Sequence, residues 1–358
     1  MKEKASMLNR LFVLFVLAIA AILTACSSDS DGEKITTSTS SSSGESSSEE
    51  LIPVTLQLKW VPQAQFAGYF VALEKGYYEE EGLDVTIAPG GPDIVPEQQV
   101  ANGAANIGVD WVASLLPHIE QGLPLIQIAQ IYQNSGLLLI SKKDAGITSP
   151  KDLASKNVGN WMGGNEFEAL ALFDKYGFDP NSDLSFVKQG FTMDQFLAGE
   201  IDAASAMTYN EYHVVLESGV PASDLNVIDM NDEGVAMLED NLFANKEWLE
   251  NNKETAAKFL RASIKGWQDA IEDPEGAVDI IMAESEEGSS TREHQLTMME
   301  EVAKLILPEG FNADDIGKTN KEMFQQTADI AYKFGVIKEK ANVDEAYTNE
   351  IFEMATSK

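Results

Sequence analysis

The feature that most constrains the fold is a strand–loop–helix rhythm that runs along the chain twice. Its first round starts at residues 54–60, where apolar and polar side chains alternate with a period of two. The segments that follow are a helix at 66–74, a strand at 83–88, a helix at 95–102, a strand at 106–109, a helix at 113–121 and a strand at 125–131. Strands and helices that alternate at this spacing are typical of parallel sheets built from βαβ units. We therefore predict an α/β fold.

A second round of the same rhythm follows residues 141–146. Ser149 as N-cap and Pro150 at the first helical position open a short helix. The later segments are strands at 157–161, 184–187 and 203–207, helices at 166–176 and 192–198, and then the helices 246–251, 253–272, 275–284, 291–306 and 320–334. The last five helices must cover a sheet that earlier segments have already built.

This order of segments predicts two doubly wound lobes joined by a hinge. The first lobe comprises residues 51–139 and the C-terminal helices of residues 239–358, and the second lobe is an insertion of residues 140–238. Two crossing strands would form the hinge. Ligands in open α/β sheets bind beyond the carboxyl ends of the strands, so facing lobes would enclose a ligand cleft.

Residues 1–25 have the layout of a signal peptide. Lys2, Lys4 and Arg10 precede an apolar run at residues 11–23 that is too short to span a bilayer. The run ends in LTAC at residues 23–26, which resembles the bacterial lipobox, in which the cysteine is lipidated. Cys26 is the single cysteine of the chain, so the sequence has no internal disulfide. We expect a protein anchored by lipid on the outer face of the cell membrane.

The segment after Cys26 and the overall charge limit the possible partners. Residues 26–50 are rich in Ser, Thr, Gly, Asp and Glu and nearly free of apolar side chains, which predicts a disordered tether. The formal net charge is −33. Nucleic acid and anionic membrane surfaces are therefore poor partners, and an anionic ligand would need cations placed locally in the cleft.

Aromatic side chains gather where the predicted strands end. They are Trp60, Phe66, Trp111, Tyr132, Trp161 and Tyr209. A planar heterocycle would stack between such rings, whereas the alternative for each one is that it only plugs the rim of its sheet. Trp60 and Trp161 form the favoured pair because one belongs to each lobe.

Polar side chains occupy the same predicted rim. They are Gln65, Asp93, Asp110, Asn134, Asn165, Glu166, Asn210 and Glu211. Amides and carboxylates suit a ring with amino groups and ring nitrogens, which needs acceptors beside donors. Asp93 has an alternative role as a helix cap, and Glu166 has one as a partner of a helix dipole. Between residues 54 and 136 the only cations are Lys59 and Lys75, and neither follows a convincing strand end, so we expect a cleft poor in cations.

Several motifs together resemble one protein family. They are LKWVPQAQFAGYFVA at 58–72, EKGYY at 74–78, GGPD at 90–93, VANG at 100–103, IGVD at 107–110 and GNWMGGNEF at 159–167. On these motifs the chain resembles the SsuA/THI5-like (NMT1-like) periplasmic binding proteins from residue 51 to about residue 347. The resemblance implies a type II periplasmic binding protein fold and a solute-binding protein that delivers its ligand to an ABC permease and its ATPase.

The resemblance leaves the ligand open, because members of this family bind sulfonates and taurine, nitrate, thiamine pyrimidine precursors or riboflavin. The aromatic and acceptor-rich rim favours a planar heterocycle, with a thiamine-type aminopyrimidine first and riboflavin second. Trp60 and Trp161 would sandwich the ring, Glu166 or Glu211 would accept from its exocyclic amine, and Asn165 would complete the pattern. Sulfonate, taurine and nitrate remain alternatives.

Two other classes of function are less well supported by the residues. A pyrimidine-synthase relative looks similar along the first lobe but uses a cysteine-rich run and histidine chemistry, which this sequence lacks. The three histidines, His118, His213 and His294, are far apart and have no metal-ligand spacing, so each is expected to be a surface or helix residue. A sensory receptor subunit would need a separate membrane partner. We expect a monomer with no catalytic residues, no metal and no cofactor.

Overall fold

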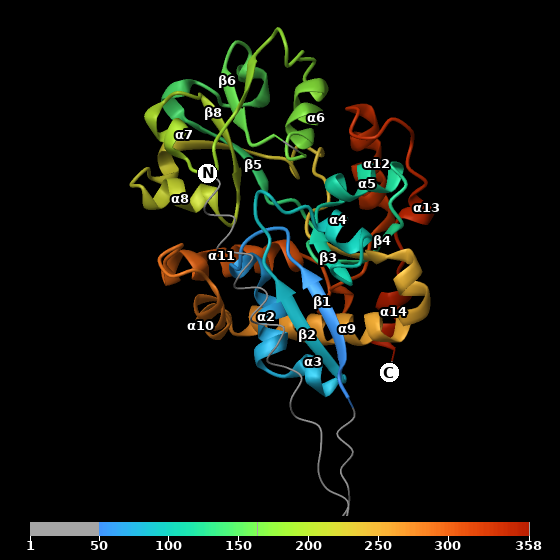
Figure 1. Cartoon of the computed structure of the whole chain (residues 1–358). Helices are drawn as coiled ribbons and strands as arrows, with labels where there is room; N and C mark the ends of the chain where they lie inside the picture. The colour runs from blue at the N-terminus through green and yellow to red at the C-terminus, as the bar shows by residue number, and fades with distance from the viewer. Residues whose placement is uncertain (1–49, 163, 358) are drawn as a thin grey trace, which may run out of the picture. The chain divides into compact units, whose positions relative to one another are not determined.

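The computed structural model describes residues 50–162 and 164–357, which hold two five-stranded sheets (Figure 1). The first sheet has the order β2-β1-β3-β10-β4, with β1 (Ile52–Gln57), β2 (Leu83–Ala88), β3 (Ile107–Asp110), β4 (Leu125–Gln130) and β10 (Asn241–Asn245). The second sheet has the order β7-β6-β8-β5-β9, with β5 (Leu137–Lys142), β6 (Asn157–Asn160), β7 (Ser185–Lys188), β8 (Ala203–Met207) and β9 (Leu225–Asp229). Each sheet and its helices form one lobe of a type II periplasmic binding protein fold.

The two strands that follow the crossings between the sheets run against their neighbours. β10 pairs antiparallel with β3 and β4, and β5 pairs antiparallel with β8 and β9, whereas the other pairs are parallel. The chain leaves each sheet at the carboxyl end of a strand and enters the other sheet from that same side. The first strand after each crossing must therefore run in the opposite direction. The parallel pairing expected from the βαβ units thus holds for the other strands and not for β5 and β10.

The crossings lie at residues 131–136 and 230–240. Because β5 already belongs to the second sheet, the first crossing precedes residue 137 instead of following residue 139. We call the two segments the hinge crossings.

The helices that cover the sheets match the expected positions closely where a cap marks their start. Their bounds are α2 (Ala67–Glu74), α3 (Tyr77–Glu80), α4 (Pro96–Ala101), α5 (Val112–Glu120), α6 (Phe167–Lys175), α7 (Asp194–Ala198), α8 (Glu211–Glu217), α9 (Lys246–Glu272), α10 (Pro274–Glu284), α11 (Arg292–Ile306), α12 (Lys321–Lys333), α13 (Val343–Ala346) and α14 (Glu350–Thr356). Asn245, Thr291 and Asn320 cap α9, α11 and α12 with their side chains. The two helices expected at 246–251 and 253–272 make up α9, and the break expected between them is present as a kink at Asn252, whose backbone is not helical.

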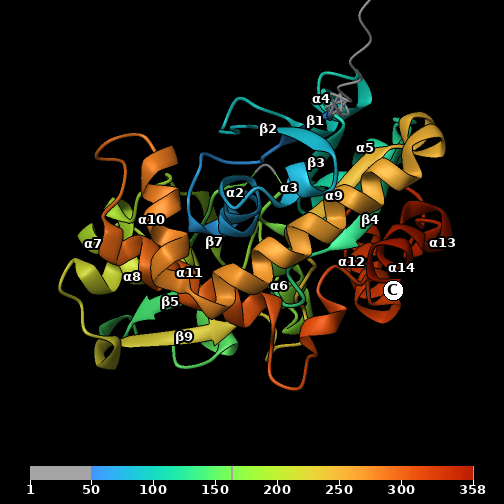
Figure 2. The same cartoon turned by 90° about the horizontal axis from the view of Figure 1, so that it is seen from below.

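The first lobe is held together by a close crossing of α2 and α9, which Figure 2 shows side by side. A Cβ atom at Gly266 would lie 2.1 Å from the carbonyl oxygen of Gly68, and a Cβ atom at Gly68 would lie 2.1 Å from the ring of Trp267, so this crossing requires glycine at both positions. Trp267, next in α9, is completely buried. Among the described residues no helix combines the length and the apolar character that a bilayer crossing requires.

A buried group of acids ties the hinge crossings to the second lobe. Ser135 Oγ lies 3.0 Å from Glu168 Oε2 and 2.9 Å from Glu239 Oε1, and it also accepts a hydrogen bond from the N–H of Leu137. A hydroxyl group has one hydrogen and can donate to only one of the two carboxyl groups. The other carboxyl group must therefore carry its own proton. Burial, together with the charge of Glu239, raises the pKa of Glu168 well above its ordinary value.

The stability of this fold should consequently fall as the solution becomes alkaline. Burial raises the pKa of Glu239 to about 8, whereas an unfolded glutamate releases its proton near pH 4.3. The stabilisation from the bound proton is complete below the unfolded pKa and is lost as the pH rises through about 8.

Glu168→Gln should weaken this pH dependence because its amide supplies the hydrogen permanently. We expect the loss in free energy of unfolding between about pH 6 and about pH 9 to shrink by on the order of 2 kcal/mol in this variant. Urea unfolding at the two pH values measures the loss, with the exposed Glu272→Gln as the matched control. An equal loss in Glu168→Gln and in the unaltered protein would contradict a shared proton at the hinge.

Candidate functional site

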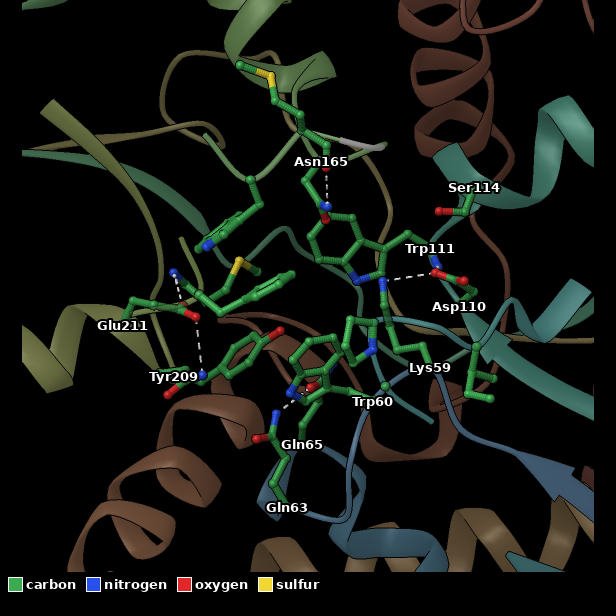
Figure 3. Close-up of a pocket in the computed structure, with 18 of the residues that line it drawn as sticks. Lys59, Trp60, Gln63, Gln65, Asp110, Trp111, Ser114, Asn165, Tyr209 and Glu211 are labelled. Carbon is green, nitrogen blue, oxygen red and sulfur yellow. Dashed lines mark hydrogen bonds and ion pairs between the residues drawn. The ribbon is translucent and has the colours of Figure 1, made fainter. Parts of the chain in front are cut away.

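A cavity of about 400 Å³ lies between the two lobes, and Figure 3 shows the residues around it. Both lobes contribute walls, at the ends where the parallel strands of each sheet finish. The lining residues are Lys59, Trp60, Gln63, Gln65, Gly91, Pro92, Ile94, Asp110, Trp111 and Ser114 from the first lobe and Trp161, Met162, Asn165, Lys188, Phe191, Met207, Tyr209, Asn210 and Glu211 from the second. The volume is in the range of small-molecule sites in proteins.

Eight of the twelve predicted ligand-binding residues line this cavity. They are Trp60, Gln65, Asp110, Trp111, Trp161, Asn165, Tyr209 and Glu211. Trp60 approaches the second lobe, because its ring centroid lies 5.3 Å from that of Phe191. The aromatic walls of the two lobes therefore touch at the edge of the cavity.

Two predicted aromatic residues lie behind the wall. Phe66 and Tyr132 are completely buried in the core of the first lobe. Tyr132 donates its hydroxyl hydrogen to the carbonyl oxygen of Gln65 at 2.9 Å, and its ring meets that of Tyr209 edge to face. For these two residues the alternative role, packing at the rim of the sheet, is the one that the structure supports.

Two predicted acids do not line the cavity either. Asp93 is exposed to solvent, and the helix α4 starts from Val95 without a side-chain cap, so Asp93 also lacks the alternative capping role. Glu166 stands at the N-cap position of α6, where its carboxylate accepts the N–H of Gly164 at 2.8 Å. Glu166 is thus occupied by the turn that precedes the helix.

The expectation of a cleft poor in cations is wrong, because two lysines line the cavity. β1 ends at Gln57, so Lys59 falls on the segment that turns across the cavity after the strand. Its Nζ lies 2.9 Å from Asp110 Oδ1 and 3.8 Å from the centre of the Trp111 ring. Lys188 is the last residue of β7. The sequence signal was present in both places, since each lysine sits at or just beyond a strand end.

A glycine allows the segment with Lys59 and Trp60 to lie where it does. A Cβ atom at Gly90 would lie 2.3 Å from the carbonyl oxygen of Leu58 and 2.5 Å from the backbone nitrogen of Trp60. The N–H of Gly90 donates to the carbonyl oxygen of Trp60 at 2.9 Å. The loop that carries Gly91 and Pro92 therefore fixes the wall that carries Lys59 and Trp60.

Asp240, at the end of the second hinge crossing, organises the floor of the cavity. Its two carboxylate oxygens accept hydrogen bonds from Gln65 Nε2 at 2.9 Å and Trp111 Nε1 at 3.0 Å. Gln63 in turn donates to Gln65 at 2.7 Å. Asp240 is 1% exposed, and burial raises its pKa to about 6. Sequence reasoning missed this residue, because no local pattern reveals a contact with residues so far along the chain.

A protonated acid, Glu97, is buried in the first lobe close to Asp110 of the cavity wall. Glu97 is 1% exposed, and burial, reinforced by the nearby charge of Asp110, raises its pKa to about 9. At neutral pH Glu97 is therefore uncharged. Asp110 is left as the carboxylate that balances Lys59, so this wall has little net charge.

The second-lobe wall presents the polar groups of the first turn of α8. Glu211 accepts the N–H of Met207 at 3.0 Å and Asn210 Nδ2 at 3.3 Å. Burial raises the pKa of Glu211 to about 7. Asn165 is held on the opposite side by Asn160, whose Nδ2 donates to its carbonyl oxygen at 3.0 Å. This wall can accept from an amine and donate to a ring nitrogen or carbonyl group.

The chemistry of the cavity is that of recognition. Rings from both lobes can stack on a planar ligand, and amide and carboxyl groups can read its edges. Within residues 50–162 and 164–357, no three His, Cys, Asp or Glu side chains are grouped so that they could hold a metal ion.

Comparison with known proteins places this architecture in a family. Residues 63–277 match the NMT1/THI5-like family. The riboflavin-binding protein RibY of Chloroflexus aurantiacus is 26% identical over 356 residues, covering 95% of this chain and 97% of its own length. The formylaminopyrimidine-binding protein of Halalkalibacterium halodurans is 27% identical over 250 residues, covering 68% of this chain and 74% of its own length.

An enzyme and a solved structure are also among the similar proteins. The 4-amino-5-hydroxymethyl-2-methylpyrimidine phosphate synthase THI13 of Saccharomyces cerevisiae is 27% identical over 236 residues, covering 62% of this chain and 68% of its own length. The periplasmic aliphatic sulphonate binding protein SsuA of Escherichia coli superposes with a TM-score of 0.63 at 14% identity, covering 84% of this chain and 92% of that chain. With the family match spanning more than half of its residues and a cavity between two such lobes, this chain belongs to the NMT1/THI5-like family.

Proposed function

We propose that this protein is an extracytoplasmic solute-binding lipoprotein of an ABC importer that captures a small planar heterocycle of the thiamine pyrimidine precursor type. The observation that carries the proposal is the interlobe cavity, whose walls contribute aromatic rings from both lobes. After capture the protein would deliver the ligand to a membrane permease with its ATPase. The similarity to a formylaminopyrimidine-binding protein supports this ligand class.

The charges of the cavity also favour a neutral or weakly basic ligand. The reason differs from the expected shortage of cations, because Lys59 is present but is matched by Asp110. The other lining groups that carry charge are Lys188 and Glu211, one of each sign. A sulfonate or nitrate would leave Glu211 facing a like charge whenever Glu211 is ionised.

Riboflavin is the second candidate ligand. The similarity to RibY extends over nearly the whole chain, including the segment after residue 277. Riboflavin has a larger ring system than a pyrimidine, and it would use more of the aromatic wall. The two ligands differ in their demands on Glu211, because an aminopyrimidine offers an exocyclic amine to it.

A binding role fits the cavity better than a catalytic one, although a related synthase is known. None of the three histidines is among the residues that line the cavity in the described part of the chain. The titratable lining groups are the two lysines, the two carboxyl groups and Tyr209. We therefore propose that the ligand leaves the cavity unchanged.

A thermal-shift panel tests the proposed function. The panel comprises 4-amino-5-hydroxymethyl-2-methylpyrimidine, formylaminopyrimidine, riboflavin, taurine, an alkanesulfonate and nitrate. A ligand at about one hundred times its Kd stabilises a protein by about 2.7 kcal/mol, which such a measurement detects. We expect the pyrimidines to raise the melting temperature most. Stabilisation by taurine, sulfonate or nitrate alone would refute the heterocycle while leaving the binding role intact.

Trp60→Ala should weaken binding of the best ligand of the panel. An aromatic ring stacked on a heterocycle contributes roughly 1–3 kcal/mol, so the Kd should rise about ten- to a hundredfold. Isothermal titration calorimetry measures the change. Trp248→Ala, which removes an indole outside the cavity, is the matched control, and its Kd should stay within about twofold. Equal Kd values for Trp60→Ala and the unaltered protein would contradict a stacking role.

The proposed location depends on Cys26, which lies outside the described residues. The signal peptide of residues 1–25, the lipobox and the tether of residues 26–50 likewise lie outside them or at their edge. Cys26→Ser should move the protein from the membrane fraction to the soluble fraction or block its processing, because the site of lipid attachment is gone. Detergent phase partitioning measures this, and Ser27→Ala, which keeps the cysteine, should remain in the detergent phase. Unchanged membrane retention of Cys26→Ser would refute the lipid anchor.

A further inference from the structure

His294 connects the two lobes at a point next to the cavity. It belongs to α11 of the first lobe and packs against α8 of the second, which lies beside α11 in Figures 1 and 2. Its Nδ1 lies 2.9 Å from Glu217 Oε1, and its Nε2 lies 3.0 Å from Asn210 Oδ1. His294 is 7% exposed. The expectation of a surface or helix residue is thus incomplete, since His294 lies on a helix but is buried between the lobes.

Both nitrogen atoms of the His294 imidazole lie within hydrogen-bond distance of an oxygen atom. Glu217 offers a carboxylate oxygen, and Asn210 offers its carbonyl oxygen because its Nδ2 donates to Glu211 Oε1 at 3.3 Å. Both ring nitrogens therefore face acceptors, and both contacts are hydrogen bonds only when each nitrogen carries a hydrogen. Bonds of this kind to a carboxylate are among the stronger ones in proteins.

The chain of contacts ends in the cavity wall. Asn210 and Glu211 both line the cavity, and neither has another first-lobe hydrogen-bond partner among the described residues. If α11 moves away from α8, the amide of Asn210 loses the group that orients it. The amide of Asn210 in turn is one of the two donors that hold the carboxyl group of Glu211.

We infer that His294 is a positioning residue for the ligand cavity, which sets Asn210 and Glu211 for binding only when α11 and α8 are in contact. The inference rests on the proposed function and deepens it, because it couples the approach of the lobes to the polar groups that read the ligand. A ligand bound to Glu211 and Asn210 would stabilise the contact of the lobes, and the contact would strengthen binding to the same extent.

A neighbouring histidine provides the matched comparison. His213 of α8 also faces α11, with its Nε2 3.8 Å from Glu301 Oε1. That distance is too long for a hydrogen bond, and His213 does not line the cavity. Loss of His213 removes an imidazole from the same contact between helices without releasing Asn210.

A mutant cycle between His294 and Asn210 tests the inference. The Kd for 4-amino-5-hydroxymethyl-2-methylpyrimidine, and for riboflavin, is measured for His294→Ala, Asn210→Ala, the double variant, His294→Gln and His213→Ala. We expect His294→Ala to raise the Kd about tenfold, and His294→Gln, which keeps one donor, to recover part of the loss. The double variant should bind no more weakly than Asn210→Ala, because His294 acts through Asn210. His213→Ala should stay within about twofold of the unaltered protein.

A second measurement makes the test independent of the ligand. Hydrogen–deuterium exchange of the ligand-free chain should be faster in α8 for His294→Ala and unchanged for His213→Ala. Effects of His294→Ala and Asn210→Ala that multiply in the double variant would overturn the positioning role, as would unchanged exchange in α8. If the unaltered protein binds neither compound, the proposed ligand class fails, and the exchange data alone decide whether His294 joins the lobes.

Discussion

The rest of the structure depends on the chain passing between its two sheets twice. Each passage starts at the carboxyl end of a strand, so the same ends of both sheets come to face one cavity. The first crossing segment carries Ser135, and the second carries the buried acids Glu239 and Asp240. The second hinge crossing ends at Asp240, which positions Gln65 and Trp111 in the wall of the cavity.

The strongly negative net charge of the protein is not reflected in the charge of the carboxyl groups near its cavity. The chain carries a formal charge of −33, yet three buried carboxyl groups of the first lobe at or behind the cavity wall are matched, protonated or hydrogen-bonded. Asp110 is matched by Lys59, Glu97 is protonated at neutral pH, and Asp240 accepts two side-chain hydrogen bonds. Burial is the main reason, because a charge removed from water must be paired or neutralised. The excess negative charge consequently lies on the surface, where water screens it.

The sequence predicted those parts of the fold that local patterns determine. Helices α11 and α12 start one residue after the predicted positions because Thr291 and Asn320 are their caps. Strands β5, β9 and β10 were not predicted. β10, Asn241–Asn245, is a five-residue segment that becomes a strand only between two partners from the first lobe. The α/β class was thus readable from period and spacing, whereas the direction of the strands after the crossings required tertiary structure.

The cavity was predictable to the extent that its residues lie at strand ends. Trp60, Trp111 and Trp161 follow their strands and line the cavity, but Phe66 and Tyr132 follow strands as well and are buried. Position near a strand end cannot distinguish a residue that lines the cavity from one that is buried in the core, because the direction of the side chain depends on the turn after the strand. Asp240 and His294 carried no local signal, since their hydrogen-bond partners Gln65 and Asn210 lie 175 and 84 positions away.

The two lobes offer a ligand different kinds of contact, because the polar groups of the first lobe are bonded to one another whereas Glu211 of the second lobe faces the cavity. In the first lobe, Asp240 is occupied by Gln65 and Trp111, and Lys59 is occupied by Asp110, so this wall offers mainly shape and ring surface. In the second lobe, Glu211 lines the cavity with a pKa of about 7, so near neutral pH it is present both as an acceptor and as a donor. A ligand that stacks on the first lobe alone would leave the polar groups at its edges without hydrogen-bond partners. If the protein binds a heterocycle as proposed, discrimination between heterocycles of similar shape requires the second lobe to be in place, and the contact between α8 and α11 would provide that condition.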